Sequence, residues 1–61
     1  MSPPSPQVIV IAPDGDAWSV QLNGEALTVH PTERDAKRSA FLLAERLRGR
    51  GPVELRVVGL D

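Results

Sequence analysis

The chain has 61 residues, a formal net charge of −1 at pH 7 and no cysteine. A chain this short forms at most one hydrophobic core, and without cysteine it has neither disulfides nor a thiolate zinc site to stabilise it. Its longest apolar run, 8–12, is far too short to span a membrane, and the N-terminus has no secretory signal pattern. We expect a soluble cytoplasmic protein of marginal stability, for which dimerisation is a natural source of additional stability.

The chain begins with a segment that differs in composition from the rest. Three of residues 1–6 are proline, which predicts a disordered tail, whereas residues 7–61 have the composition of a single domain. From Val8 to Ile11 every residue is β-branched, which is typical of a strand. Pro13 ends this strand, and the residues after it have turn chemistry.

A second strand is indicated by alternation of apolar and polar residues. The residues expected on its buried face are Trp18, Val20 and Leu22. Asn23-Gly24 follows, and this dipeptide is the strongest short signal for a type I′ hairpin. We therefore predict a third strand over 25–30, antiparallel to the second, with Leu27 and Val29 facing the core.

The segment after Pro31 predicts an amphipathic helix. Thr32 is at the N-cap position, acidic residues follow it, and arginines near the end of the segment complement the helix dipole. Gly49 or Gly51 offers a positive-φ stop, and Pro52 prevents continuation. Apolar residues spaced by three and four form the stripe expected to face the sheet, namely Ala36, Ala40, Leu43, Ala44 and Leu47.

Residues 53–58 alternate again and predict a fourth strand. Because this strand follows a helix, we expect it to return beside the first strand, parallel to it, giving the spatial order 3-2-1-4. The predicted fold class is α+β. It is a small β-β-β-α-β domain with an antiparallel three-strand meander and one helix packed on one face.

Several of these residues together carry a resemblance to a known family. They are the run Val10–Val20 with Pro13, Gly15 and Trp18, then Gly24, Thr32–Ala36, Ala40, Ala44 and the strand Glu54–Val58. In this combination the chain resembles the bacterial domain-of-unknown-function 2188 family over about residues 8–61. The motifs are structural, so the resemblance implies the fold described above and implies no catalytic or binding residue.

Groups suited to catalysis are few. His30 is the only histidine and has no identifiable partner, so a solvated strand end is favoured over a general base or ligand. Asp14 and Asp16 lie in a turn, but no third acidic ligand for Ca²⁺ or Mg²⁺ lies nearby in the sequence. We therefore expect a protein that is not an enzyme and has no cofactor, metal site or small-molecule substrate.

The leading functional hypothesis is an interaction module that self-associates. One helix covers only one face of a sheet, so if Val8 and Val10 meet the helix, apolar residues remain on the other face. The expected interaction surface consists of Ile9, Ile11 and Val58, with Leu42 from the helix. Coverage of Ile9 and Ile11 by the tail or by sheet twist is an equally weighted alternative. The contact surface is then either the exposed sheet face or a strand edge. It binds a second copy of the chain, giving a homodimer, or a different protein partner.

The runner-up hypothesis is a nucleic-acid-binding accessory domain. On a helical wheel Phe41 lies among four cations, Arg34, Lys37, Arg38 and Arg48. Such a stripe suits contact with phosphates, with the aromatic ring stacking on a base. A solvated helix face is the favoured alternative, because residues 32–61 carry a balance of only +2.

Overall fold

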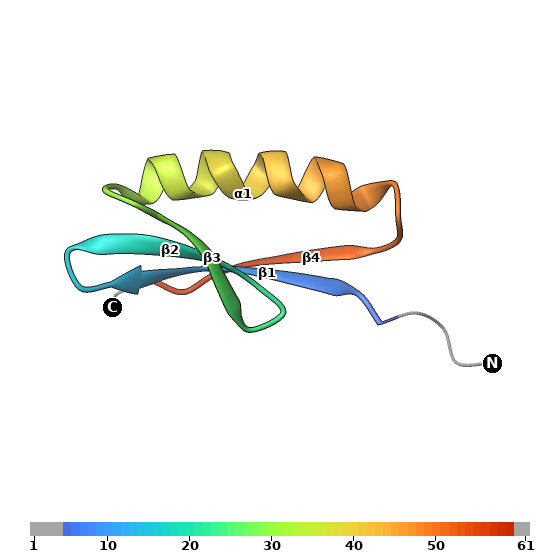
Figure 1. Ribbon diagram of the computed structural model, residues 1–61, viewed down its shortest axis with the longest axis horizontal. Helices are drawn as coiled ribbons and strands as arrows, with labels where there is room; N and C mark the ends of the chain where they lie inside the picture. The colour runs from blue at the N-terminus through green and yellow to red at the C-terminus, as the bar shows by residue number, and fades with distance from the viewer. Residues whose placement is uncertain (1–4, 60–61) are drawn as a thin grey trace.

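The chain folds into a four-stranded mixed sheet with a helix along one face (Figure 1). The computed structural model describes residues 5–59, so residues 1–4 of the predicted tail lie outside it. Within that range the elements are β1 (Gln7–Asp14), β2 (Ala17–Leu22), β3 (Glu25–His30), α1 (Glu33–Arg48) and β4 (Val53–Val57). The predicted α+β class and β-β-β-α-β order are therefore confirmed.

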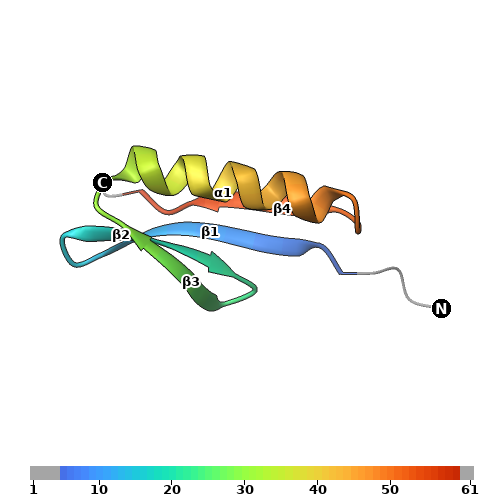
Figure 2. The same cartoon turned by 45° about the horizontal axis from the view of Figure 1, so that its top comes forward.

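The strand order is β3-β2-β1-β4. β1 pairs antiparallel with β2, and β2 pairs antiparallel with β3. β4 returns beside β1 and runs parallel to it, with α1 forming the connection between them (Figure 2). The predicted meander, the spatial order and the parallel last strand are all confirmed.

The β2–β3 hairpin has the predicted turn. Asn23 and Gly24 have φ angles of 52° and 89°, the left-handed conformation that a type I′ turn requires at both central positions. The Asn23 side chain also holds the start of β1: its Oδ1 accepts from the backbone N–H of Val8 at 2.9 Å, and its Nδ2 donates to Oε1 of Gln7 at 2.7 Å. The turn is thus fixed to a strand that is distant in sequence.

α1 begins and ends near the positions predicted. The hydroxyl of Thr32 accepts from the backbone N–H of Asp35 at 3.1 Å, so Thr32 is the N-cap. Gly49 at the C-cap has φ −67°, and the positive φ lies instead at Gly51, with 148°. The chain then turns into β4 through Pro52, whose carbonyl accepts from the N–H of Gln7 at 3.0 Å.

The core lies between α1 and the middle of the sheet. Its fully buried members are Ile9, Ile11, Val20, Ala36, Ala40 and Ala44. The predicted alanine stripe is confirmed: three small side chains let the helix approach β1 and β2 closely, and Leu43 and Leu47 pack beside it. Because alanine contributes little area, the two isoleucines of β1 supply much of the core volume.

The expected orientation of β1 is wrong. Ile9 and Ile11 face the helix, while Val8 and Val10 lie on the uncovered face. The register gives the reason: Ile11 pairs with Val20, and directly paired residues point to the same side of a sheet. A run of four β-branched residues has no alternation, so the sequence of β1 alone does not show which side is buried.

The expected burial of Leu27 and Val29 on β3 is also wrong. Leu27 and Val29 are 48% and 57% exposed. Val20 pairs with Thr28 and its neighbour Gln21 with Ala26, so Leu27 is an extra residue that shifts the alternation. In addition, β3 is an edge strand that slopes away from α1 (Figure 2), and the helix packs mainly on β1 and β2. Little of β3 is therefore covered.

Candidate functional site

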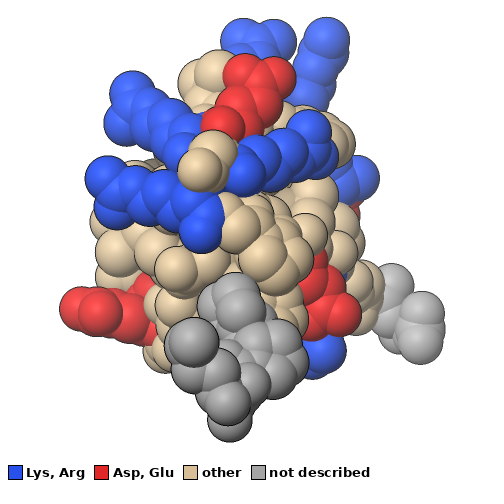
Figure 3. All heavy atoms as spheres, turned by 90° about the vertical axis from the view of Figure 1, so that its right-hand side faces the viewer, with Lys and Arg blue, Asp and Glu red and all other residues tan. Residues whose placement is uncertain are grey.

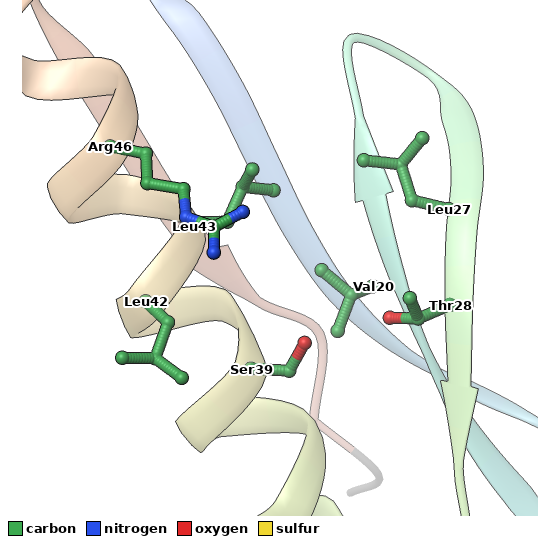
Figure 4. A pocket seen from close by; sticks show the side chains of 7 residues that line it. All are labelled: Val20, Leu27, Thr28, Ser39, Leu42, Leu43 and Arg46. Carbon is green, nitrogen blue, oxygen red and sulfur yellow. The ribbon is translucent and has the colours of Figure 1, made fainter.

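A groove separates β3 from α1. Its volume is about 260 Å³, and its lining residues are Val20, Leu27, Thr28, Ser39, Leu42, Leu43 and Arg46. Figure 4 shows the helix residues on one side, Leu27 and Thr28 on the other, and Val20 between them. We call this feature the β3–α1 groove.

The groove follows from the position of β3 at the edge of the sheet. Val20 is 1% exposed and closes the floor, whereas Leu27 and Leu42 on the two walls are 48% and 59% exposed. Two large apolar side chains thus stand beside an apolar floor without covering each other. Arg46 contributes the charged group of the lining. Apolar surface gathered in this way is typical of a contact site rather than of scattered exposed residues.

The free edge of β3 differs from the opposite edge of the sheet. The inner residues of β3, Ala26 to Val29, are uncharged, although the strand begins with Glu25 and is followed by Pro31. β4, by contrast, follows Pro52 and carries Glu54 and Arg56, which form an ion pair at 2.9 Å. Proline and charged side chains discourage pairing at an edge, so β4 is protected along its length, whereas β3 has such residues only at its two ends. The bulge at Leu27 is the further protective device on β3.

The uncovered sheet face is less apolar than expected. Alternation and register place Val8, Val10 and Ala12 of β1 there, but their neighbours on β2 and β4 are polar: Ser19, Gln21, Glu54 and Arg56. Ser19 is buried, and its hydroxyl donates to the carbonyl of Ala12 at 3.4 Å while accepting from Nε2 of Gln21 at 3.2 Å. Because Ser19 is buried, the accessible part of this face combines apolar side chains of β1 with the polar side chains of Gln21, Glu54 and Arg56.

The structure separates the residues of the predicted interaction surface. Ile9 and Ile11 are buried under α1 and inaccessible, so their assignment to a surface is wrong. Leu42 and Val58 are 59% and 47% exposed, but Leu42 lines the groove beside β3 whereas Val58 follows β4 at the opposite edge. Leu27, which lines the groove from β3, was predicted to lie in the core, because the sequence shows neither the bulge nor how little of β3 the helix covers.

Most of the predicted nucleic-acid contact residues lie together in the structure, unlike those of the predicted interaction surface. Arg34, Lys37, Arg38 and Phe41 line one hollow of about 360 Å³ on the outer side of α1, together with Leu42. Their spacing of three and four residues puts them on one helix face. Arg48 is outside this lining and lies about 10 Å farther along the helix axis than Phe41. We call this feature the Phe41 hollow.

The three cations of the Phe41 hollow differ in whether an acidic side chain is paired with them. Nζ of Lys37 lies 3.2 Å from a carboxylate oxygen of Glu33, one turn earlier, which neutralises part of its charge. Among residues 5–59, Arg34 and Arg38 have no ion-pair partner. Figure 3 shows basic side chains gathered over the helix layer, with an acidic side chain between them, and further acidic groups at the level of the sheet.

Groups suited to catalysis or metal binding remain dispersed. Nε2 of His30 lies 3.0 Å from the hydroxyl of Thr28 on the same strand. Within residues 5–59 there is no group of three or more histidine or acidic side chains that could hold a metal ion. None of the helical structure in this range is long and apolar enough to cross a membrane.

Comparison with family models, with curated protein sequences and with solved structures gave no match to this chain. The resemblance to the domain-of-unknown-function 2188 family therefore stays a prediction. The function has to be argued from the two surfaces described above.

Proposed function

We propose that the protein is a non-catalytic interaction module that pairs with a second copy of itself through the edge of β3 and the β3–α1 groove. The observation that carries this proposal is the pair of half-exposed leucines, Leu27 and Leu42, on the two walls of an apolar groove beside a strand edge that is uncharged from Ala26 to Val29. A cytoplasmic location is part of the proposal, supported by the absence of cysteine, which suits a reducing compartment.

Antiparallel pairing of β3 with its copy would satisfy the free backbone groups at this edge. A two-fold axis perpendicular to the sheet keeps both helices on the same side, so the two grooves would join into one apolar trough. Leu27 and Leu42 of both copies would line that trough, and Val29 would be covered on the other side of the sheet. Such isologous contacts are the commonest form of protein self-association.

The small size of the domain supports this pairing. A chain of about 60 residues buries only about 60% of the surface that its unfolded form exposes, so its own core leaves it marginally stable. The three buried helix residues here are alanines, which add little apolar area. Burial of leucines against a second copy would therefore add stability where the monomer lacks it.

Light scattering over a dilution series tests the proposal. We expect the native chain to change from dimer to monomer on dilution, and Leu27→Lys to be monomeric at every concentration because a charge would be placed in the trough. Val57→Lys is the matched control: Val57 is 46% exposed on the opposite edge strand, close to the 48% of Leu27. Circular dichroism would verify that both variants stay folded.

The outcomes separate the candidate surfaces. A native chain that is monomeric at all concentrations would remove self-association. Loss of the dimer in Val57→Lys but not in Leu27→Lys would move the interface to β4. Dimers that survive both changes but dissociate in Val10→Lys would assign the contact to the uncovered sheet face instead.

A further inference from the structure

The charges of the chain are divided between its two layers. The segment 33–50, which contains α1, carries six basic and three acidic residues, a net charge of +3, while the other described residues carry one basic and four acidic residues, a net charge of −3. A balance of −1 for the whole chain therefore hides a positive helix layer above a negative sheet layer (Figure 3). An anionic partner would be attracted to the outer side of α1.

Phe41 stands within this positive layer and is 54% exposed. It plays no part in the core, although it is the only phenylalanine of the chain. Arg34, Lys37 and Arg38 line the Phe41 hollow with it, and this hollow is shallow and open to solvent. A flat apolar ring and two arginines that have no ion-pair partner among residues 5–59 thus share one exposed helix face.

We infer that the Phe41 hollow binds single-stranded nucleic acid, with a base stacked on Phe41 and the flanking phosphates on Arg34 and Arg38. Aromatic stacking combined with cations that follow the backbone is the usual means of binding single strands without sequence preference. A duplex fits less well, because its bases are already stacked on one another and would have to be unstacked, at an energetic cost, before one could stack on Phe41. The inference does not depend on the proposed dimer, with which the hollow shares only Leu42 among its lining residues.

The number of cations limits the strength of binding. Arg34 and Arg38, together with Lys37, which is paired with Glu33, can neutralise two or three phosphates. For three such contacts, a plot of the logarithm of affinity against the logarithm of salt concentration should have a slope of about −2. We expect weak binding at low ionic strength that is lost at physiological salt.

Fluorescence anisotropy with labelled oligothymidylate, and with a duplex of mixed sequence, provides the test. We expect the single strand to bind more tightly than the duplex, and Phe41→Leu to weaken single-strand binding about tenfold by removing the stacking ring. Arg38→Ser should lower the steepness of the salt dependence by about 0.7. Arg56→Ser is the matched control, since it removes the same charge from β4 on the sheet layer.

Glu33→Gln supplies a variant that gains function. It removes the carboxylate that holds Lys37, so we expect tighter binding and a salt dependence steeper by about 0.7. Loss of fold cannot produce this result. Leu27→Lys should leave binding unchanged, which keeps the outcome separate from that of self-association.

Any of the following results would overturn the inference. One is the absence of binding to the single strand at low salt. Another is equal loss of binding in Arg38→Ser and Arg56→Ser, which would show attraction by overall charge alone. The third is unchanged binding in Phe41→Leu, or binding of heparin that matches that of the oligonucleotide in every variant, which would exclude stacking.

Discussion

Asn23 fulfils two roles that differ in how far the sequence shows them. The left-handed turn is local, since Asn and Gly tolerate positive φ and the flanking strands require it. The bonds from its side chain to Val8 and Gln7 reach 15 and 16 residues back along the chain. They depend on the β1–β2 register, in which Ile9 is opposite Leu22 and the turn therefore lies next to the start of β1.

Substitutions at Asn23 separate these two roles. Asn23→Gly keeps the turn but loses both side-chain bonds, and we expect it to lower the free energy of unfolding by about 1 kcal/mol. Asn23→Ala also has to hold a β-carbon at positive φ, which costs about 1–2 kcal/mol more. Urea unfolding followed by tryptophan fluorescence measures both. Equal stability of Asn23→Gly and the native chain would show that the bonds to β1 contribute nothing.

At the scale of elements, α1 is specified mostly by its own residues. The cap at Thr32, the acidic first turn and the basic last turn all act within the helix, and the stripe of small residues is readable from spacing alone. The strands behave differently. Burial in β3 depends on its place at the edge and on a bulge opposite Val20 and Gln21 in β2, and neither is encoded within β3 itself.

Thr32→Ala tests the contribution of the cap. The backbone N–H of Asp35 would lose its acceptor, so we expect the free energy of unfolding to fall by about 1 kcal/mol. Thr32→Ser retains the hydroxyl and is the control. Both are compared by urea unfolding monitored with far-ultraviolet circular dichroism. If the serine variant loses as much stability as the alanine variant, the methyl group rather than the hydrogen bond is responsible.

The whole molecule is a two-layer domain in which one helix covers part of one face. The helix packs mainly over β1 and β2, so exposed large apolar side chains remain on β3 and along the helix, and also at the β4 edge, where Val57 and Val58 lie. The proposed dimer contact combines residues that the tertiary fold brings together, and the proposed nucleic-acid contact combines residues on one face of α1. Leu42 lies between them and lines both the β3–α1 groove and the Phe41 hollow.

Self-association has a consequence for thermal stability. If the folded dimer is the stable form, each tenfold rise in concentration adds about 0.7 kcal/mol per chain. For a domain of this size that shift corresponds to an increase of about 3–6 °C in Tm. Differential scanning calorimetry at several concentrations should show this trend for the native chain and for Val57→Lys. Leu27→Lys should have a Tm that does not vary with concentration, and a constant Tm for the native chain would contradict the proposal.

The sequence by itself determined the features that depend on near neighbours: the five elements and their order, the Asn23–Gly24 turn, the cap at Thr32 and the buried face of the helix. It also grouped four of the five residues that line the Phe41 hollow, because a single helix period places them together, although it added Arg48, which lies outside the hollow. Only the tertiary structure decided which side of β1 is buried. Val8 to Ile11 are all equally apolar, so pairing with β2 had to place Ile9 and Ile11 beneath the alanines of α1. The same holds for Leu27, whose exposure arises from a bulge and from the limited reach of one helix across a twisted sheet.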